Sequence, residues 1–331
     1  MQSKSWRAAS FAAIATLLAG TVSAQSLPAG PGQGTSAPSA RYIPPKTPWG
    51  DPDLEGLWPG SMNVPLQRPE GFGERNVLTD EELAARNRAE SQEVALHHWM
   101  EYYAATRQAS LIVDPKDGRL PPMTLEAARR NREIRDGLGP PSRESVEKRA
   151  ESWRDFDLWG RCITRGLVGS MLPGKPYNKG NQIHQAPGYI VIRNEMVHEA
   201  RVIPLDGRPH AGPRLRSYMG DSRGHWEGNV LVVETTNFLN DTSMSGIDSV
   251  LLTDQLRIIE RLTRTAPDKL SYAATVEDSG TWTRPWTIQI SFKLDPNYKL
   301  YEYGCHEGNY ALANILSGAR QSEKKTAHAG H

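Results

Sequence analysis

From residue 189 onward the sequence alternates between polar and apolar residues, and this period of two constrains the fold more than any other feature. Such alternation is typical of β-strands with one buried face. Turn-forming pairs such as Asp206-Gly207 and Ser279-Gly280 separate many of the runs. The predicted strands cover 189–193, 196–204, 229–236, 255–265, 270–277, 286–294 and 299–303. Short turns between seven or eight such strands predict an antiparallel up-and-down meander, closed as a lipocalin-like barrel, with an open β-sandwich as the alternative.

Helical signals precede the strands. Thr79 and Glu82 have the spacing of a capping box, which predicts a helix from Thr79 to about Arg107. Two further helices are expected over 124–137 and 142–156, and a helix-like segment over 311–319. There is no alternation of strands and helices and no glycine-rich phosphate loop, which argues against a nucleotide-binding α/β fold. The fold class is therefore mainly β with N-terminal helices.

The first residues have the pattern of a secretory signal peptide. Lys4 and Arg7 precede an apolar run over 8–20, and Val22-Ser23-Ala24 places small residues at a cleavage site. The apolar run is too short to span a bilayer, and no later run reaches the roughly 18 residues that a spanning helix needs. We therefore expect a periplasmic or secreted protein with no integral membrane segment in the mature chain.

Composition divides the rest of the chain. After the signal peptide at 1–24, residues 25–48 are rich in Pro, Gly, Ser and Ala, which predicts a disordered linker. An aromatic segment and the helical region follow at 49–160, then a β-rich barrel domain at 161–320 and a disordered tail at 321–331.

Charge and aromatic content limit the classes of partner. The 39 Lys and Arg residues nearly balance the 38 Asp and Glu residues, so bulk electrostatic binding to nucleic acid is not expected. Trp and Tyr (9 and 11) outnumber Phe (5). Rings with a polar group suit wet binding surfaces, although they also pack at the edges of ordinary cores. The expected partner is a small molecule or an oligosaccharide.

Two cysteines are present, Cys162 and Cys305. Export would allow them to form a disulfide closing a loop of roughly 140 residues, and two buried free thiols are the alternative. A cysteine nucleophile is not expected in an oxidising compartment, and two cysteines cannot form a zinc site of the clustered type.

Ionisable residues are concentrated at predicted turns and strand ends, where catalytic groups often lie. Histidine exchanges protons near neutral pH, and arginine recognises carboxylates and hydroxyl arrays. The candidate catalytic residues are His198, His306, Glu307, His210 and Asp206. The candidate substrate-binding residues are Arg161, Arg165, Arg208, His225, Trp226, Asn309, Trp282 and Trp286.

Simpler roles compete with these assignments. Along 196–204 the alternation places His198 on one face and Glu199 and Arg201 on the other, so the last two also fit a solvated face with a cross-strand ion pair. His198 also fits a structural histidine, and the Asp206-Gly207 pair an ordinary hairpin turn.

The cysteine pairing would decide the role of the segment around residue 305. If Cys305 pairs with Cys162, then His306 and Glu307 share one neighbourhood with Arg161 and Arg165. Alternatively, His306 and Glu307 cap the helix-like segment that follows.

Metal and serine chemistry have weak support. The sequence contains no His-x-His pair, no His-Glu-x-x-His helix and no Gly-x-Ser-x-Gly elbow. Histidines 184, 198, 210, 225 and 306 are spread along the chain. We therefore predict no cofactor, and a metal ion would require several of these distant histidines to converge in the fold.

Five motifs resemble those of a large group of exported bacterial proteins. They are Trp49–Trp58 (WGDPDLEGLW), Arg161–Gly166 (RCITRG), Ile203–His210 (IPLDGRPH), Gly220–Gly228 (GDSRGHWEG) and Cys305–Tyr310 (CHEGNY). The resemblance covers nearly the whole mature chain and implies one exported unit, but it transfers no catalytic residue. Lys179 and His184 depart from the uncharged residues that the resemblance implies at their positions.

These observations leave two hypotheses. The first is an exported acid/base enzyme, a lyase, isomerase or hydrolase, acting on a small polar, aromatic or sugar-like substrate in a cavity lined by Trp, Tyr, His and Arg. The second is a non-catalytic exported barrel that binds a small aromatic or sugar-like ligand. An enzyme needs a poorly satisfied histidine or carboxylate facing an open cavity, whereas a binding protein needs static, satisfied polar pairs.

Overall fold

A computed structural model of the chain describes residues 42–60, 62–96, 106–135, 151–173, 177–240, 242–243 and 250–329. The predicted signal peptide lies outside these residues, as do 25–41 of the predicted linker. Backbone hydrogen bonds join Thr47 to Asp51 and Asp53 to Pro45, both at 2.8 Å. The predicted disorder over 25–48 is therefore wrong for its last residues, because this turn ties them to the aromatic segment.

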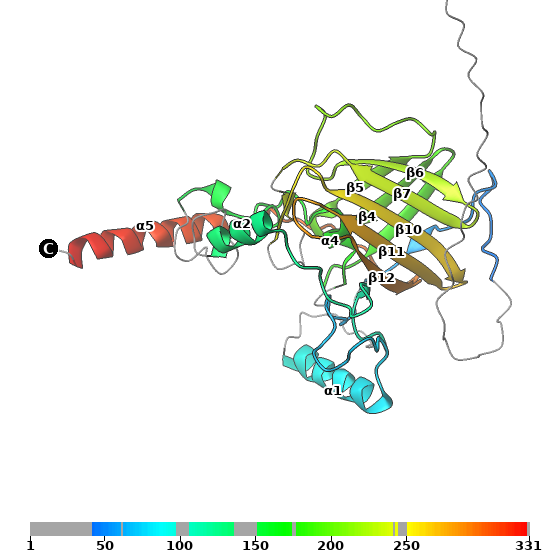
Figure 1. Cartoon of the computed structure of the whole chain (residues 1–331), viewed down its shortest axis with the longest axis horizontal. Helices are drawn as coiled ribbons and strands as arrows, with labels where there is room; N and C mark the ends of the chain where they lie inside the picture. Colours follow the sequence, from blue (N-terminus) through cyan, green and yellow to red (C-terminus); the bar gives the residue numbers. More distant parts are fainter. Residues whose placement is uncertain are drawn as a thin grey trace, which may run out of the picture. The chain divides into compact units, whose positions relative to one another are not determined.

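The described strands form two main antiparallel sheets, which confirms a mainly β fold (Figure 1). The first has the order β1-β3-β4-β5, from β1 (Gly56–Leu57), β3 (Asn181–Ala186), β4 (Tyr189–Asn194) and β5 (Ala200–Pro204). The second has the order β2-β12-β11-β10-β7-β6, from β2 (Ile112–Asp114), β6 (Asp221–Glu227), β7 (Val230–Thr236), β10 (Arg257–Ala266), β11 (Lys269–Glu277) and β12 (Trp286–Lys293). A short ladder joins β8 (Thr242–Ser243) to β9 (Leu251–Leu252). Among the described residues, no ladder joins the two main sheets, so a closed barrel stays a prediction.

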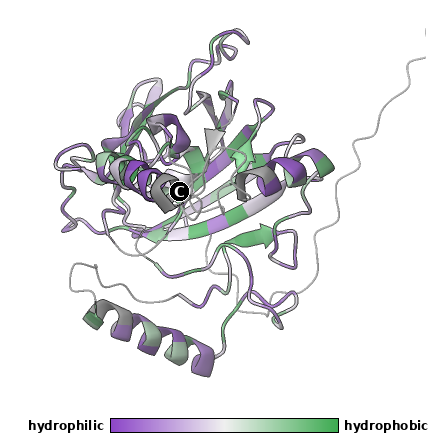
Figure 2. Ribbon diagram, turned by 90° about the vertical axis from the view of Figure 1, so that its left-hand side faces the viewer, coloured by the Kyte–Doolittle hydropathy of each residue, from purple (hydrophilic) through white to green (hydrophobic). Residues whose placement is uncertain are grey.

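Alternating burial explains why the strands form. Along β11, the buried residues are Leu270, Tyr272, Ala274 and Val276, while the residues between them reach the surface. The same alternation of hydrophilic and hydrophobic residues is visible along the ribbons (Figure 2). A single buried cluster combines residues of both main sheets. Each large apolar side chain buried in it contributes about 1.5–3 kcal/mol, so the shared core holds the sheets together.

Two of the predicted strands differ in the structure. The segment predicted as a strand over 196–204 begins with the 3-10 turn η2 (Met196–His198), and β5 starts at Ala200. Val197 and His198 have φ angles of 63° and 46°, in the left-handed region, which ends the strand alternation there. The segment predicted over 299–303 belongs to none of the sheets, because Tyr301 donates its backbone N–H to the Glu195 carboxylate at 3.0 Å.

The helices are placed as follows: α1 (Asp80–Leu96), α2 (Leu125–Arg135), η1 (Trp153–Asp155), α4 (Leu167–Met171) and α5 (Ala311–Ala329). The predicted capping box of α1 is confirmed by reciprocal hydrogen bonds between Thr79 and Glu82 at 2.8 and 3.2 Å. Helix α5 continues through 321–329, where the sequence predicted a disordered tail. The Ala and Lys residues of this segment favour the helix. None of the described helices is long and apolar enough to cross a membrane.

A buried ion pair bridges the two main sheets. Arg201 of β5 forms a bidentate pair with Glu260 of β10, and the Tyr272 hydroxyl of β11 donates to the same carboxylate at 2.9 Å. Arg201 is 8% exposed, and Glu260 and Tyr272 are fully buried. The alternative of a solvated face for Arg201 is therefore wrong; Ala200 and Val202 are the exposed residues of this strand.

Gly220, which precedes β6, has a backbone conformation and close contacts that a substitution can test. Gly220 has a φ of +68°, and a Cβ atom there would lie 2.5 Å from the Thr236 carbonyl oxygen. Gly228 has a similar φ of +61° but no atom within 4 Å of its Cβ position. We expect Gly220→Ala to lower the free energy of unfolding by about 3 kcal/mol and Gly228→Ala by about 1, because only the first adds a clash to the backbone strain. Equal losses in urea unfolding would contradict this account.

Candidate functional site

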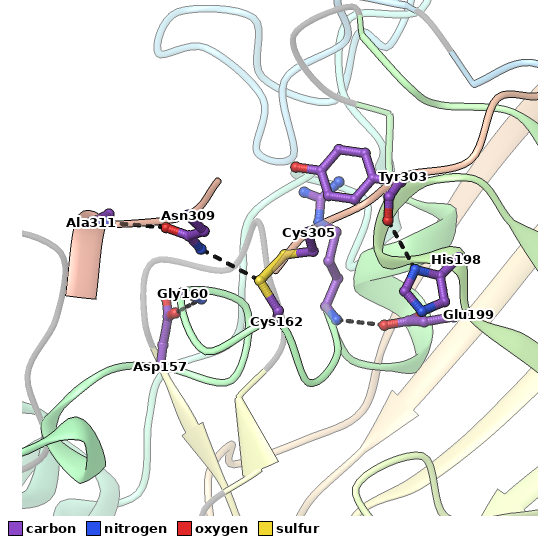
Figure 3. Close-up of a disulfide and its surroundings, with 10 residues drawn as sticks. Asp157, Gly160, Cys162, His198, Glu199, Tyr303, Cys305, Asn309 and Ala311 are labelled. Carbon is purple, nitrogen blue, oxygen red and sulfur yellow. Dashed lines mark hydrogen bonds between the residues drawn. A yellow bond between two sulfur atoms is a disulfide. The ribbon is translucent and has the colours of Figure 1, made fainter. Parts of the chain in front are cut away.

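The Cys162–Cys305 disulfide, with Cα atoms 5.7 Å apart, confirms the predicted pairing. It joins the turn that follows η1 to the segment that follows β12. Figure 3 shows this junction, with Asn309 and Gly160 on one side of the disulfide and Tyr303 and His198 on the other. The disulfide brings together two regions that are separated in the sequence by strands β3 to β12.

Local hydrogen bonds shape the turn that carries Cys162. Asp157 accepts from the Gly160 backbone through its side chain at 2.5 Å and from the Arg161 backbone through its carbonyl at 3.1 Å. The Cys162 N–H donates to the Trp159 carbonyl at 2.9 Å. An aspartate that bonds its own following backbone stabilises tight turns of this kind. Trp159 in this turn is half-buried and lines the same pocket as Cys305.

A pocket of about 420 Å³ lies between this turn and the start of α5. Its lining residues are Phe156, Asp157, Trp159, Gly160, Tyr303, Cys305, Asn309, Ala311, Leu312 and Ile315. The volume falls in the range of pockets that take small organic molecules. Three aromatic rings and two aliphatic side chains dominate the wall, and Asp157, Tyr303 and Asn309 supply polar atoms.

One cationic side chain, that of Arg165, lies behind this wall. The Arg165 guanidinium carbon lies 5.1 Å from the centre of the Trp159 ring. Tyr177 and Tyr303 lie near Arg165 and hydrogen-bond to each other. Burial lowers the pKa of Arg165, although it stays protonated. Arg161 instead stacks on Trp153 at 4.7 Å, outside the pocket lining.

His198 and Glu199 are structurally engaged beside this site. The His198 Nδ1 atom lies 2.9 Å from the Tyr303 carbonyl oxygen. The Glu199 carboxylate accepts from the Arg165 backbone at 2.7 Å and from the Ser170 hydroxyl. Neither residue lines the pocket. These contacts fix the segments that hold Arg165 and Tyr303.

Lys179 was not among the residues selected from the sequence. Its side chain is 5% exposed, and its ammonium donates to the Leu172 carbonyl at 3.1 Å. Burial lowers the pKa of Lys179 to about 7, and the neighbouring Arg165 charge acts in the same direction. The departure from an uncharged residue at this position was the one sequence signal that singled it out.

The remaining catalytic candidates are dispersed. His210 lies 3.1 Å from an Asp221 oxygen and 3.7 Å from a Glu234 oxygen, in an ion-pair network on the second sheet that also contains Arg257. Asp206 pairs with Arg208, and this lowers the pKa of the Asp206 carboxyl. His306 and Glu307 are exposed near the disulfide but do not line the pocket.

The aromatic candidates on the second sheet also lie away from the pocket. Trp282 and Trp286 are 2% and 0% exposed and pack edge to face, with ring centres 5.4 Å apart. They belong to the core and do not line the pocket. His225 pairs with Glu227 at 3.3 Å, beside Trp226 on β6. Of the predicted binding residues, Asn309 alone lines the pocket, and Arg165 lies behind it.

We compared the chain with protein-family models, curated proteins and solved structures. No match was found in any of these comparisons. The likeness of the five motifs to exported bacterial proteins therefore stays a prediction, and the site must be interpreted from its own geometry. Within the described residues, no group of three or more His, Cys, Asp or Glu side chains is placed to hold a metal ion.

Proposed function

We propose that the protein binds a small organic molecule with an aromatic or aliphatic body in the pocket beside the Cys162–Cys305 disulfide, and releases it unchanged. The observation that carries this proposal is the wall made by Phe156, Trp159 and Tyr303. Rings stack on flat ligands and lose little side-chain entropy when they bind. The disulfide supports a rigid pocket, because Cys305 lines it directly.

The state of the polar groups favours binding over turnover. Asp157 is held by the Gly160 backbone, and Asn309 donates to the Cys162 sulfur at 3.6 Å and accepts from the Ala311 backbone at 3.2 Å. A binding protein uses such satisfied, static groups, whereas a general base must be poised to take a proton. The acid/base enzyme hypothesis stays a prediction, with its candidate catalytic residues outside the pocket lining.

We also infer that the two main sheets are the halves of a lipocalin-like barrel. At one junction, a Cβ atom on Gly224 of β6 would lie 2.6 Å from the Leu205 side chain, which directly follows β5. At the other, the Asp295 N–H donates to the Leu57 carbonyl of β1 at 3.1 Å, just after β12 ends. Strand β12 pairs with the edge strand β2 at Thr287 and Ile288, well before Asp295. Contacts at both junctions therefore favour closure. An exported location is part of the same proposal, because disulfides persist in oxidising compartments.

Trp159→Ala tests the proposed pocket. We expect it to weaken binding of any pocket ligand about 10- to 100-fold, because truncating a ring that lines a site costs about 1–3 kcal/mol. Probes are benzoate, cinnamate and 2-naphthoate with their amides, and binding is measured by isothermal titration calorimetry. Trp153→Ala is the matched control, since Trp153 is 51% exposed and does not line the pocket. Equal weakening by both variants, or recovery of a chemically altered probe, would contradict the proposal.

A further inference from the structure

The two cysteines of the Cys162–Cys305 disulfide lie in different surroundings. Cys305 is half-buried and lines the proposed pocket, whereas Cys162 is 9% exposed and does not line it. A thiolate breaks a disulfide by attacking one of its two sulfur atoms, and access helps to decide which sulfur is attacked. A thiol that enters the pocket therefore reaches Cys305 rather than Cys162.

The sulfur atom of Cys162 has a hydrogen-bond donor. The side-chain amide of Asn309 donates to this Sγ atom at 3.6 Å, on the side of the disulfide away from Tyr303 (Figure 3). The oxygen of the same amide accepts from the Ala311 backbone at 3.2 Å, which holds the amide in place. A donor to sulfur stabilises the negative charge that develops on a leaving thiolate. The Asn309 amide therefore favours Cys162 as the leaving group.

The backbone of Cys162 also favours its release. Its φ of 55° lies in the left-handed region, which is unfavourable for a residue with a Cβ atom. Such conformations persist where the surrounding structure holds them. Two of the constraints here are the disulfide and the hydrogen bond from the Cys162 N–H to the Trp159 carbonyl at 2.9 Å. Cleavage of the disulfide removes one of these constraints.

We propose that this disulfide is a covalent acceptor site for small organic thiols, with Cys305 attacked and Cys162 released. The thiol loses its proton to solvent, and its sulfur attacks Sγ of Cys305. A new S–S bond joins the ligand to Cys305 as the bond to Cys162 breaks. The electron pair of the broken bond leaves on Sγ of Cys162, which takes a proton from solvent. One disulfide is exchanged for another, so no further oxidant or reductant is needed.

The wall of the pocket determines which thiols react fastest. Phe156, Trp159 and Tyr303 line the same pocket as Cys305. A ligand whose ring stacks on this wall keeps its thiol near the disulfide, which raises the effective concentration of the thiol. This preference for a ring rests on the proposed function, whereas the attack on Cys305 rests on the surroundings of the disulfide.

Phenylmethanethiol and 2-mercaptoethanol test the site, because both carry their thiol on a saturated carbon and only the first has a ring. Each thiol is added in excess to the full chain in mildly alkaline buffer. N-ethylmaleimide added at intervals caps the free thiols, and peptide mass spectrometry locates the adduct. We expect early samples to carry the thiol on Cys305 and the maleimide on Cys162. Phenylmethanethiol should react about tenfold faster, the factor expected for one stacked ring.

Two substitutions separate the wall from the amide. Trp159→Ala should remove the advantage of phenylmethanethiol and leave the 2-mercaptoethanol rate unchanged, while Trp153→Ala, outside the pocket lining, changes neither rate. Asn309→Ser keeps an acceptor for the Ala311 backbone and lacks the amide donor. It should slow both thiols several-fold and by the same factor. A merely structural role for Asn309 would have the opposite sign, because a loosened disulfide is more accessible and reacts faster.

The outcomes separate this inference from the proposed function. Adduct on Cys162, or no adduct on Cys305 in any sample, would overturn the covalent site, even if the carboxylate and amide probes bind in a manner that depends on Trp159. Adduct on Cys305 at equal rates for the two thiols would support the covalent site and contradict the aromatic preference of the pocket. The location of the adduct on the unmodified chain decides the proposal even if a variant does not fold.

Discussion

Replacing both cysteines, with Cys162→Ala and Cys305→Ala, should lower the free energy of unfolding by about 5 kcal/mol, the chain-entropy value for a crosslink that spans 143 residues. The variant should also lose ligand binding at the pocket, because the pocket wall includes Cys305 and the turn that carries Cys162. Urea unfolding followed by tryptophan fluorescence measures the first effect, and calorimetric titration with 2-naphthoate the second.

Reduction provides the matched control for this variant. Dithiothreitol should lower the unfolding midpoint of the unmodified chain to that of the double variant and leave the double variant unchanged. Two alanines also avoid the free thiol that a single substitution would create. A double variant with an unaltered midpoint and unaltered ligand binding would show that the crosslink supports neither the fold nor the pocket.

The second large effect concerns the ion pair that bridges the sheets. Arg201→Met should lower the free energy of unfolding by about 3–5 kcal/mol, because it leaves the fully buried Glu260 carboxylate without its counter-charge. Tyr272 compensates little, since its hydroxyl is one neutral donor. Burial, together with Glu260, raises the Tyr272 pKa well above its ordinary range, so the hydroxyl stays protonated.

A triple variant separates lost charge pairing from lost packing. Arg201→Met with Glu260→Leu and Tyr272→Phe removes the pair and the hydroxyl that would otherwise be left unpaired. Buried ion pairs replaced by apolar side chains of similar volume are often neutral in stability. We therefore expect the triple variant to recover most of the loss in urea unfolding. An equal loss of unfolding free energy in the single and triple variants would show that lost packing alone causes the effect.

Alternation predicted those strands whose buried face is apolar. Strands β4, β7, β10, β11 and β12 were predicted to within about two residues at each end. Strand β3 was not, because its buried face includes Asn181 and Gln185. Gln185 replaces apolar packing with hydrogen bonds to Pro52 and Leu54, at 3.1 and 2.6 Å. A pattern based on hydrophobicity does not detect a strand whose inward side chains are polar but satisfied.

The opposite error occurred near residue 301. The segment 299–303 alternates like a strand, but Glu195 captures the Tyr301 backbone N–H, so the segment lies outside the sheets. The Glu195 side chain lies more than a hundred residues away in the sequence. Hydrogen-bond partners at such separation are set by tertiary structure, which local periodicity does not encode.

The sequence predicted the cysteine junction but not the pocket beside it. The cysteine pairing predicted that Arg165 and the segment around residue 305 would be neighbours, and the disulfide confirms that junction. The pocket itself uses Trp159, Leu312 and Ile315, none of which is among the site residues predicted from the sequence. Lys179 owes its properties to burial beside Arg165, which the sequence does not reveal.

The pocket wall comes from turns and the first turns of a helix, and none of its lining residues belongs to a strand of the main sheets. The buried cluster that stabilises the sheets does not include Trp159, Tyr303, Leu312 or Ile315. Substitutions at these four positions therefore change the shape of the wall at little cost to the core. Because the wall and the core use different residues, point mutations can change the ligand that fits the pocket without destabilising the sheets. Related chains should therefore differ more in this wall than in their sheets.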